Sequence, residues 1–314
     1  MKEEPILEVT DLRTSFFTPL GERQAVNGIS YTLGRGEIMG IVGESGSGKS
    51  VQAYSILGLL PNAGRVVGGS IRFEGEELLK TSPERLRKLR GKQIAMVFQN
   101  PFGSLNPVCT IGTQLIEAYR THNKKRDGRK QAIALLEQVG VNDASRRMRQ
   151  YPHELSGGMC QRVMIAMALI CDPQVLIADE PTTALDVTVQ AEILDLLRRL
   201  QEERNLSVLM ISHNLNVVAE LCDRIAVMYG GRIMEQGRSV FQNPRHPYTQ
   251  GLLRSIPVED QKLTPIPGNP ADHNTRGCPF APRCTEAIAK CHTKIPESVE
   301  IESDHFVACI KEKL

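Results

Sequence analysis

A glycine-rich segment near the start of the chain constrains its fold more than any other feature. The segment is Gly43-Glu44-Ser45-Gly46-Ser47-Gly48-Lys49-Ser50, here called the phosphate loop. The apolar residues 38–42 before it predict a buried strand, and residues 51–60 after it predict a helix. Such a turn lets backbone N–H groups surround phosphates, and the helix N-terminus adds positive partial charge. The segment therefore predicts a nucleotide site in an α/β domain.

Residues of the phosphate loop have separate expected roles. Lys49 can reach the β- and γ-phosphates, and the Ser50 hydroxyl can hold a Mg²⁺ ion. An ordinary glycine-rich turn is the structural alternative, which the strand before and the helix after disfavour. The backbone at four further positions is expected to line the phosphates: Gly43, Ser45, Gly46 and Gly48.

A second apolar run ends in two carboxylates. Residues 175–178 predict a buried parallel strand, and Asp179 and Glu180 follow it, at the strand edge where α/β proteins bind ligands. We expect Asp179 to hold Mg²⁺ through water, and Glu180 to orient and deprotonate the attacking water. Two solvated acids in a turn are the alternative, which the phosphate loop makes less favourable.

The segment Leu155-Ser156-Gly157-Gly158-Met159 lies between these two motifs. It resembles the signature motif of the ATP-binding cassette subunits of ABC transporters, although its last residue departs from the usual Gln. Ser156, Gly157 and Gly158 stand at the start of a predicted helix, whose N–H groups suit an anion. The resemblance implies that this anion belongs to ATP held by a second cassette. A helix N-cap by Ser156 is the structural alternative, and both can hold together.

The resemblance covers residues 6–250 and implies roles for further residues. Gln99 matches the glutamine loop, which senses Mg²⁺ and touches the membrane subunit. Asp186 matches the loop that crosses the dimer interface. His213 matches the switch histidine at the γ-phosphate. Phe16 matches the aromatic residue that stacks on adenine, with a place in the core as its alternative.

Short strings narrow the resemblance to one branch of the family. Residues 245–253 resemble the C-terminal motif of the oligopeptide, dipeptide and nickel ATPases, and residues 106–107 and 151–154 fit the same branch. The branch implies an importer of di- or oligopeptides. Import of nickel or a metal chelate is the alternative within the same branch.

Composition limits the other function classes. A net charge of +2 gives no strong field for nucleic acid. No apolar run reaches the ~18 residues of a membrane span, and no N-terminal apolar segment predicts a signal peptide. We therefore expect a peripheral protein on the cytoplasmic face of the membrane. A soluble DNA-associated ABC ATPase is a distant alternative, because the stretch from Ser50 to Leu155 is too short for the inserted domain of such proteins.

Four of the eight cysteines lie near the C-terminus: Cys278, Cys284, Cys291 and Cys309. A cytoplasmic chain should not hold stable disulfides, so clustered thiols favour a metal. No two of them have the short spacing of structural zinc ligands, which favours a [4Fe–4S] cluster over zinc or unliganded thiols. The dipeptide ATPases that the chain resembles have a similar tail. His292 and His305 are expected at the solvated surface, although either could replace a cysteine ligand.

The expected architecture is α/β, with a RecA-like P-loop core, an antiparallel β subdomain and a helical signature subdomain, plus a small cysteine-rich tail. We expect the cassette domain over residues 1–255, with its helical subdomain near 101–170, and the C-terminal extension over 256–314. Residues 69–98 are expected to form strands and turns. The prolines of residues 244–270 predict an extended connection.

The resemblance also implies an assembly. Its members would be a second ABC ATPase subunit of different sequence, two transmembrane permease subunits and an extracytoplasmic substrate-binding protein, without nucleic acid. Two cassettes would close head to tail around two ATP molecules. Closure and hydrolysis would then drive the permeases between inward- and outward-facing states.

Overall fold

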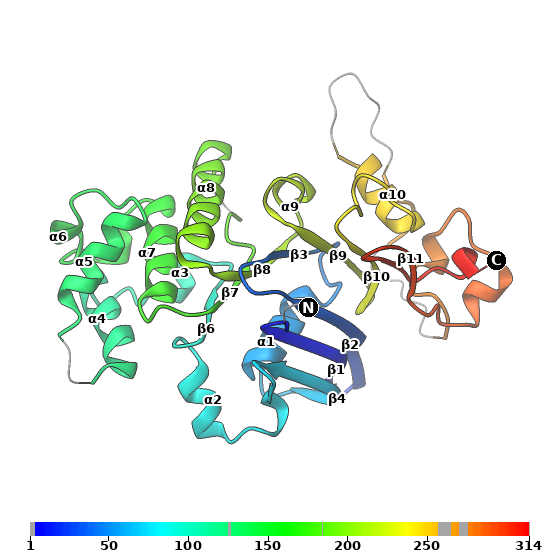
Figure 1. The fold of residues 1–314 in the computed structure, drawn as a ribbon, viewed down its shortest axis with the longest axis horizontal. Helices are drawn as coiled ribbons and strands as arrows, with labels where there is room; N and C mark the ends of the chain where they lie inside the picture. Colours follow the sequence, from blue (N-terminus) through cyan, green and yellow to red (C-terminus); the bar gives the residue numbers. More distant parts are fainter. Residues whose placement is uncertain (1–3, 125–126, 184, 257–264, 270–275, 314) are drawn as a thin grey trace. The chain divides into compact units, whose positions relative to one another are not determined.

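The computed structural model describes residues 4–124, 127–183, 185–256, 265–269 and 276–313. Two compact units make up the chain (Figure 1).

The first unit contains Met1–Leu33, Ile38–Leu79 and Met210–Leu314, and the second contains Gly34–Glu37 and Lys80–Leu209. The phosphate loop and the cysteine tail therefore belong to the first unit, and the signature segment belongs to the second.

An antiparallel sheet in the first unit has the strand order β2-β1-β4-β5. Leu7, Val9 and Leu12 on β1 are buried, while Asp11 is exposed in the left-handed region, with φ 47. The register shifts between Val9 and Leu12, because this bulge inserts an extra residue. The strands are β1 (Leu7–Thr18), β2 (Gly21–Leu33), β4 (Gly64–Phe73) and β5 (Glu76–Glu77). The sheet confirms the expected antiparallel β region.

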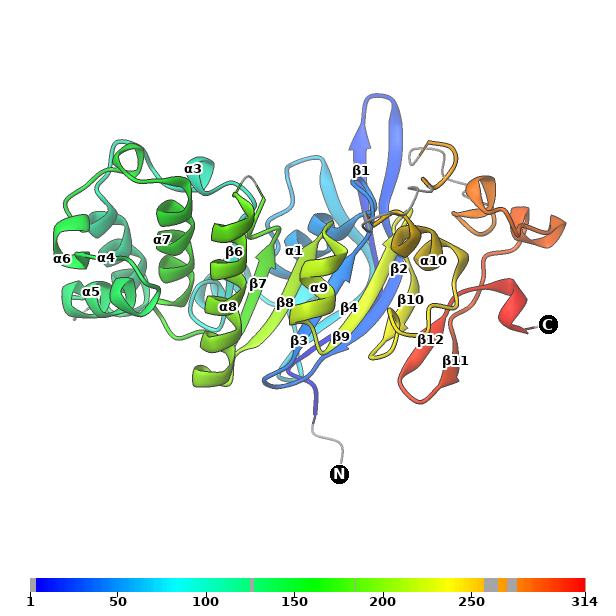
Figure 2. The ribbon, with the colours of Figure 1, turned by 90° about the horizontal axis from the view of Figure 1, so that it is seen from above.

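A second set of strands in this unit carries the phosphate loop. β3 pairs in parallel with β9, and β9, β10, β12 and β11 follow one another in antiparallel pairs (Figure 2). β3 is buried along its whole length, as expected for a strand covered on both faces. The strands are β3 (Ile38–Val42), β9 (Arg224–Tyr229), β10 (Arg232–Gly237), β11 (Val299–Glu302) and β12 (His305–Val307).

Three helices accompany these strands: α1 (Lys49–Leu57), α9 (Leu215–Leu221) and α10 (Pro247–Arg254). The expectation of an extended connection over residues 244–270 is wrong where α10 forms, and its residues 257–264 and 270 lie outside the described ranges. His246 caps this helix through its side chain, which accepts from the Tyr248 N–H, and Pro247 fits the first turn because its missing N–H needs no partner there.

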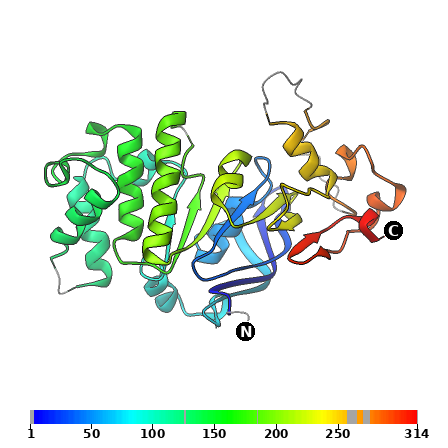
Figure 3. The same cartoon turned by 45° about the horizontal axis from the view of Figure 1, so that its top comes forward.

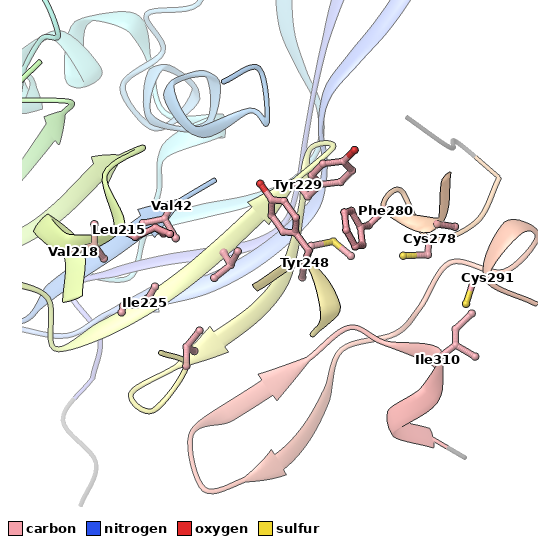
Figure 4. Close-up of a cluster of buried hydrophobic side chains, with 14 residues drawn as sticks. Val42, Leu215, Val218, Ile225, Tyr229, Tyr248, Cys278, Phe280, Cys291 and Ile310 are labelled. Atoms are coloured by element: carbon pink, nitrogen blue, oxygen red, sulfur yellow. The ribbon is translucent and has the colours of Figure 1, made fainter. Parts of the chain in front are cut away.

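The tail packs on the same unit through a buried cluster. Tyr229, Tyr248 and Phe280 face one another, and Cys278 and Cys291 belong to the same cluster (Figure 4). The ring centroids of Tyr229 and Phe280 lie 5.3 Å apart, and those of Tyr248 and Phe280 lie 5.1 Å apart. The tail also contains short 3-10 turns: Ala281–Arg283, Ala289–His292 and Ile310–Lys313.

The second unit combines a parallel strand pair with helices (Figure 3). β6 and β7 are buried along their whole length. The strands are β6 (Ile94–Val97) and β7 (Val175–Asp179). The helices are α2 (Pro83–Leu89), α3 (Pro101–Ser104), α4 (Ile111–His122), α5 (Arg129–Gln138), α6 (Ala144–Arg147), α7 (Gly157–Leu169) and α8 (Val187–Arg204). Shorter turns are Leu78–Lys80, which contains the boundary between the units after Leu79, and Pro152–Glu154 in the second unit. β8 (Ser207–Ser212) contains the boundary between the units.

The expectation of strands and turns over residues 69–98 missed α2. Ser82 accepts a hydrogen bond from the Arg85 N–H at 3.3 Å, and Pro83 occupies the first turn. A serine N-cap followed by proline is a helix-start signal, so the sequence contained the evidence for this helix. No helix within the described ranges is both long and apolar enough to span a membrane.

Candidate nucleotide-binding site

The phosphate loop runs from the end of β3 into the first turn of α1. Lys49 is 5% exposed, and its ammonium donates to the backbone oxygens of Gly43 at 2.7 Å and Glu44 at 2.9 Å. Ser50 follows it in the helix, while Ser45 and Gly46 are exposed. The lysine thus lies against the loop that it is expected to serve, with its charge at the N-terminal end of the helix.

Two glycines of the loop meet backbone atoms. A Cβ atom at Gly43 would lie 2.1 Å from the Met228 carbonyl oxygen, and one at Gly48 would lie 2.5 Å from the Ala25 oxygen. Gly48 also has a φ of 101, in the region that favours glycine. Both positions therefore need glycine to bring the loop close to its neighbours.

The tail contacts the phosphate loop through Glu44. The Arg283 guanidinium donates to both Glu44 carboxylate oxygens, at 2.6 and 3.1 Å, and the Glu44 N–H donates to the Tyr248 hydroxyl at 3.0 Å. Burial alone would lower the pKa of Arg283, but its hydrogen bonds to Glu44 and Tyr229 outweigh burial and raise it. Sequence reasoning missed this contact, because nothing local pairs residue 44 with residue 283.

In the second unit, β7 delivers the two predicted acids. Asp179 is 1% exposed, and Glu180 follows in the left-handed region with a φ of 48, a conformation that costs about 1–2 kcal/mol for a residue with a Cβ. One Glu180 carboxylate oxygen accepts from the Gln99 amide at 2.8 Å and from the Thr183 hydroxyl at 2.9 Å. The structure thus brings Gln99 and Glu180 into contact, which the two separate sequence motifs did not predict.

The signature segment starts α7. The Ser156 hydroxyl accepts from the Met159 N–H at 3.3 Å, so Ser156 is an N-cap, as the structural alternative held. A Cβ at Gly158 would lie 2.7 Å from a Val189 methyl, whereas one at Gly157 would lie 3.7 Å from Leu185. Packing within this unit therefore leaves no room for a side chain at Gly158, whereas a Cβ at Gly157 would make only ordinary contacts.

Three further predicted residues occupy defined places. Asp186 is exposed and caps α8 by accepting from the Val189 N–H at 3.0 Å. His213 is exposed between β8 and α9, and Phe16 is half-buried on β1. The dimer-interface role of Asp186, the switch role of His213 and the adenine role of Phe16 stay predictions.

The four tail cysteines line one small cavity of about 20 Å³. Burial raises the pKa of the Cys278 thiol to about 12, and burial also raises the pKa of Cys284. None of the eight cysteines, all of which lie in the described ranges, forms a disulfide. Across those ranges no three His, Cys, Asp or Glu side chains form a group that could hold a metal ion. The predicted cluster therefore has no support from the arrangement of these side chains, and it stays a prediction.

The expectation that His305 lies at the solvated surface is wrong. Its side chain is fully buried on β12 and lies 2.8 Å from a Glu235 carboxylate oxygen, which belongs to β10. The Glu235 carboxylate also accepts from the backbone N–H groups of Arg245, at 2.8 Å, and His246, at 3.0 Å. The sequence around His305 did not predict its contact with Glu235, because the two residues lie on different strands.

Comparison with known proteins places these features in a family. The family model described as ABC transporter matches residues 26–183, and the model for the oligopeptide/dipeptide transporter C-terminal region matches residues 234–291. Among solved structures, a dimeric ATP-binding cassette bound to ADP and Pi has a TM-score of 0.64 at 27% identity, covering 74% of this chain and 98% of its own. CbiO1 of Clostridium perfringens also has a TM-score of 0.64, at 30% identity, over 76% of this chain and 90% of its own.

Curated relatives match nearly the full chain. A putative peptide import ATP-binding protein of Brucella melitensis is 49% identical over 99% of this chain and 98% of its own length. The oligopeptide transport ATP-binding protein OppD of Salmonella typhimurium is 50% identical over 93% of this chain and 89% of its own. The dipeptide transport ATP-binding protein DppD of Bacillus subtilis is 48% identical over 98% of this chain and 94% of its own. This chain therefore belongs to the ATP-binding subunits of the ABC transporter family, in the branch defined by the oligopeptide/dipeptide transporter C-terminal region.

Proposed function

We propose that this chain is the ATP-hydrolysing subunit of an importer of di- or oligopeptides. The observation that carries the proposal is the phosphate loop, with Lys49 held against it at the start of α1. The names of the relatives support the peptide class, since OppD and DppD are described as oligopeptide and dipeptide transport proteins. The names of these relatives give no support to the nickel or metal-chelate alternative.

The residues divide the work of hydrolysis. Lys49 and the loop backbone bind the phosphates, and Mg²⁺, when bound, neutralises charge that develops on them. Ser50 and Asp179 have the oxygen donors that Mg²⁺ prefers, with Gln99 in the same role. Glu180 acts as general base for the attacking water, and the Gln99 and Thr183 donors fix its carboxylate.

Other motifs act in the assembly. We infer that Ser156, Gly157 and Gly158 complete the site of a facing cassette, because exposed helix N–H groups suit phosphate, and that Asp186 lies near that interface. Such a complex also contains two permeases and a substrate-binding protein, and it places this chain peripherally on the cytoplasmic face of the membrane.

For the tail we propose a [4Fe–4S] cluster bound by the four cysteines, with zinc as the alternative. The residue type supports the proposal, because four thiols line one small cavity, but their side chains would have to move to form a ligand set, since no three of them are grouped for a metal in the described structure. Burial opposes thiolates there, so bound iron would have to stabilise the deprotonated sulfurs. Anaerobic purification should give a brown protein with about four irons per chain. Colourless protein with stoichiometric zinc would reject the cluster and keep the site.

Two variants test the nucleotide site. Lys49→Ala should abolish ATP binding, because it removes the cation at the phosphates. Glu180→Gln should keep binding but lose about 10²–10⁴-fold in turnover, the usual contribution of a general base. Equilibrium binding of ATP tests the first prediction, and the rate of phosphate release tests the second. Unchanged hydrolysis in Glu180→Gln would remove this residue from its assigned role.

A further inference from the structure

Arg283 lies in the cysteine tail, but its guanidinium pairs with Glu44 of the phosphate loop. The residue ends a 3-10 turn, immediately before Cys284. Its side chain is 3% exposed, and that of its partner Glu44 is 23% exposed. The two groups form a bidentate pair, at 2.6 and 3.1 Å, the geometry in which a guanidinium holds a carboxylate most specifically.

The remaining contacts of Arg283 fix it in place. Its Nε–H donates to the Pro267 oxygen at 2.7 Å, and a terminal nitrogen donates to the Tyr229 hydroxyl at 3.3 Å. The guanidinium carbon also lies 5.6 Å from the centre of the Tyr229 ring. A Cβ at Gly268 would lie 3.0 Å from the side-chain stem of Arg283. Contacts from two segments, residues 267–268 and Tyr229 of β9, therefore hold this cation in position beside Glu44.

Glu44 is held by more than its carboxylate. Its N–H donates to the Tyr248 hydroxyl, and its backbone oxygen accepts from the Lys49 ammonium. Tyr248 belongs to α10, and Tyr248 and Tyr229 pack against Phe280 of the tail (Figure 4). One residue of the phosphate loop thus receives contacts from the loop's own lysine, from α10 and from the tail.

A carboxylate in this position is electrostatically costly for a nucleotide site. Glu44 is part of the loop whose N–H groups are expected to meet phosphates, and two negative charges close together repel strongly where water is partly excluded. Arg283 neutralises that carboxylate and orients the loop residue that bears it. We propose that Arg283 is a positioning residue for ATP binding, through which the order of the cysteine tail sets the affinity of the phosphate loop for ATP.

This proposal rests on the proposed function, and charge substitutions at the pair test it. Arg283→Met should weaken binding of ATP with Mg²⁺ to the full-length chain by about tenfold, because Glu44 becomes an uncompensated charge. Glu44→Gln should not weaken binding, because it removes negative charge beside the phosphates. The double variant Arg283→Met with Glu44→Gln should recover most of the wild-type affinity. A merely structural pair would instead lose affinity in both single variants.

Calorimetric titration with ATP and Mg²⁺ gives the binding constants, and thermal melting reports folding. Arg238→Met is the matched control, because Arg238 forms an exposed ion pair with Asp304 at 3.3 Å in the same unit. Arg283→Lys keeps the charge without the bidentate geometry and should fall between wild type and Arg283→Met. It also keeps the test valid if Arg283→Met does not fold.

The outcomes separate the inference from the proposed function. Wild-type affinity in Arg283→Met, or a double variant no better than Arg283→Met, would overturn the role of Arg283. A wild-type chain that binds no ATP would instead contradict the proposed function. The KM for ATP should rise in Arg283→Met while kcat at saturating ATP stays close to wild type, because the pair acts on binding.

Discussion

At the scale of single residues, the two neighbouring glycines of the signature segment, Gly157 and Gly158, differ in how much space surrounds them. A Cβ at Gly158 would meet Val189 at 2.7 Å, whereas Gly157 has its nearest neighbour at 3.7 Å. We expect Gly158→Ala to lower the free energy of unfolding by about 1–3 kcal/mol, the usual cost of overpacking. Gly157→Ala should leave stability unchanged. Urea denaturation of both variants measures the difference, and equal losses would contradict the packing argument.

Buried His246 makes stability depend on pH. Burial lowers its pKa to about 3, so the folded state keeps it neutral while the unfolded state binds a proton below about pH 6.5. The unfolded state then holds more protons, and stability falls as the pH drops from about 6.5 towards 3. At about pH 5.5 this histidine alone should cost about 1.4 kcal/mol.

His246→Asn isolates that effect, because asparagine can still accept from the Tyr248 N–H and cap α10. The free energy of unfolding of wild type and variant is compared near neutral pH and at about pH 5.5. All other ionisable groups are common to both proteins, so their contributions cancel in the difference. The wild type should lose more stability than the variant, and an equal loss would exclude His246 as the source.

At the scale of elements, one buried pair connects β12, β10 and the start of α10. His305 contacts the Glu235 carboxylate, which also accepts the N–H groups of Arg245 and His246. His305→Ala should cost about 3 kcal/mol, because it removes one partner of a buried carboxylate. His292→Ala is the control, since His292 lies exposed in the same tail. Thermal unfolding tests the pair, and equal stabilities of the two variants would refute it.

Local sequence signals were sufficient for some elements and insufficient for others. The apolar runs of β3 and β7 and the glycines of the phosphate loop predicted strand, turn and helix correctly, because each signal is contained within a few residues. α2 and α10 were missed although Ser82 and His246 cap them. At α10 the reason is that the prolines of residues 244–270 predicted an extended connection, whereas Pro247 occupies the first turn of the helix. Nothing in the sequence indicated where β11 and β12 belong, because β12 joins the sheet by pairing with β10 and β11 joins it by pairing with β12.

The same distinction holds within the site. The place of Lys49 at the phosphate loop and the places of Asp179 and Glu180 at the end of β7 follow from motifs, because each depends on adjacent residues. Arg283 does not, because its partner Glu44 is far away in sequence and only the folded tail brings them together. His305 was misplaced for the same reason: its partner Glu235 lies on another strand.

At the scale of the whole molecule, the account predicts that one cassette is incomplete. Ser156→Arg should leave ATP binding at Lys49 intact but impair hydrolysis in a complex, because the altered segment would complete the facing cassette's site. The isolated chain should hydrolyse ATP slowly, and addition of the partner cassette and permeases should raise the rate. Binding and phosphate release, measured with and without partners, test this. Full activity of an isolated monomer would contradict it.

The most direct test of ATP-driven peptide import is uptake in cells that lack this chain. Labelled dipeptide and oligopeptide uptake should be lost, restored by the wild-type chain, and not restored by Glu180→Gln at equal protein level. Nickel uptake, measured in the same cells, should not change. Unchanged peptide uptake without the chain, or loss of nickel uptake alone, would contradict the account.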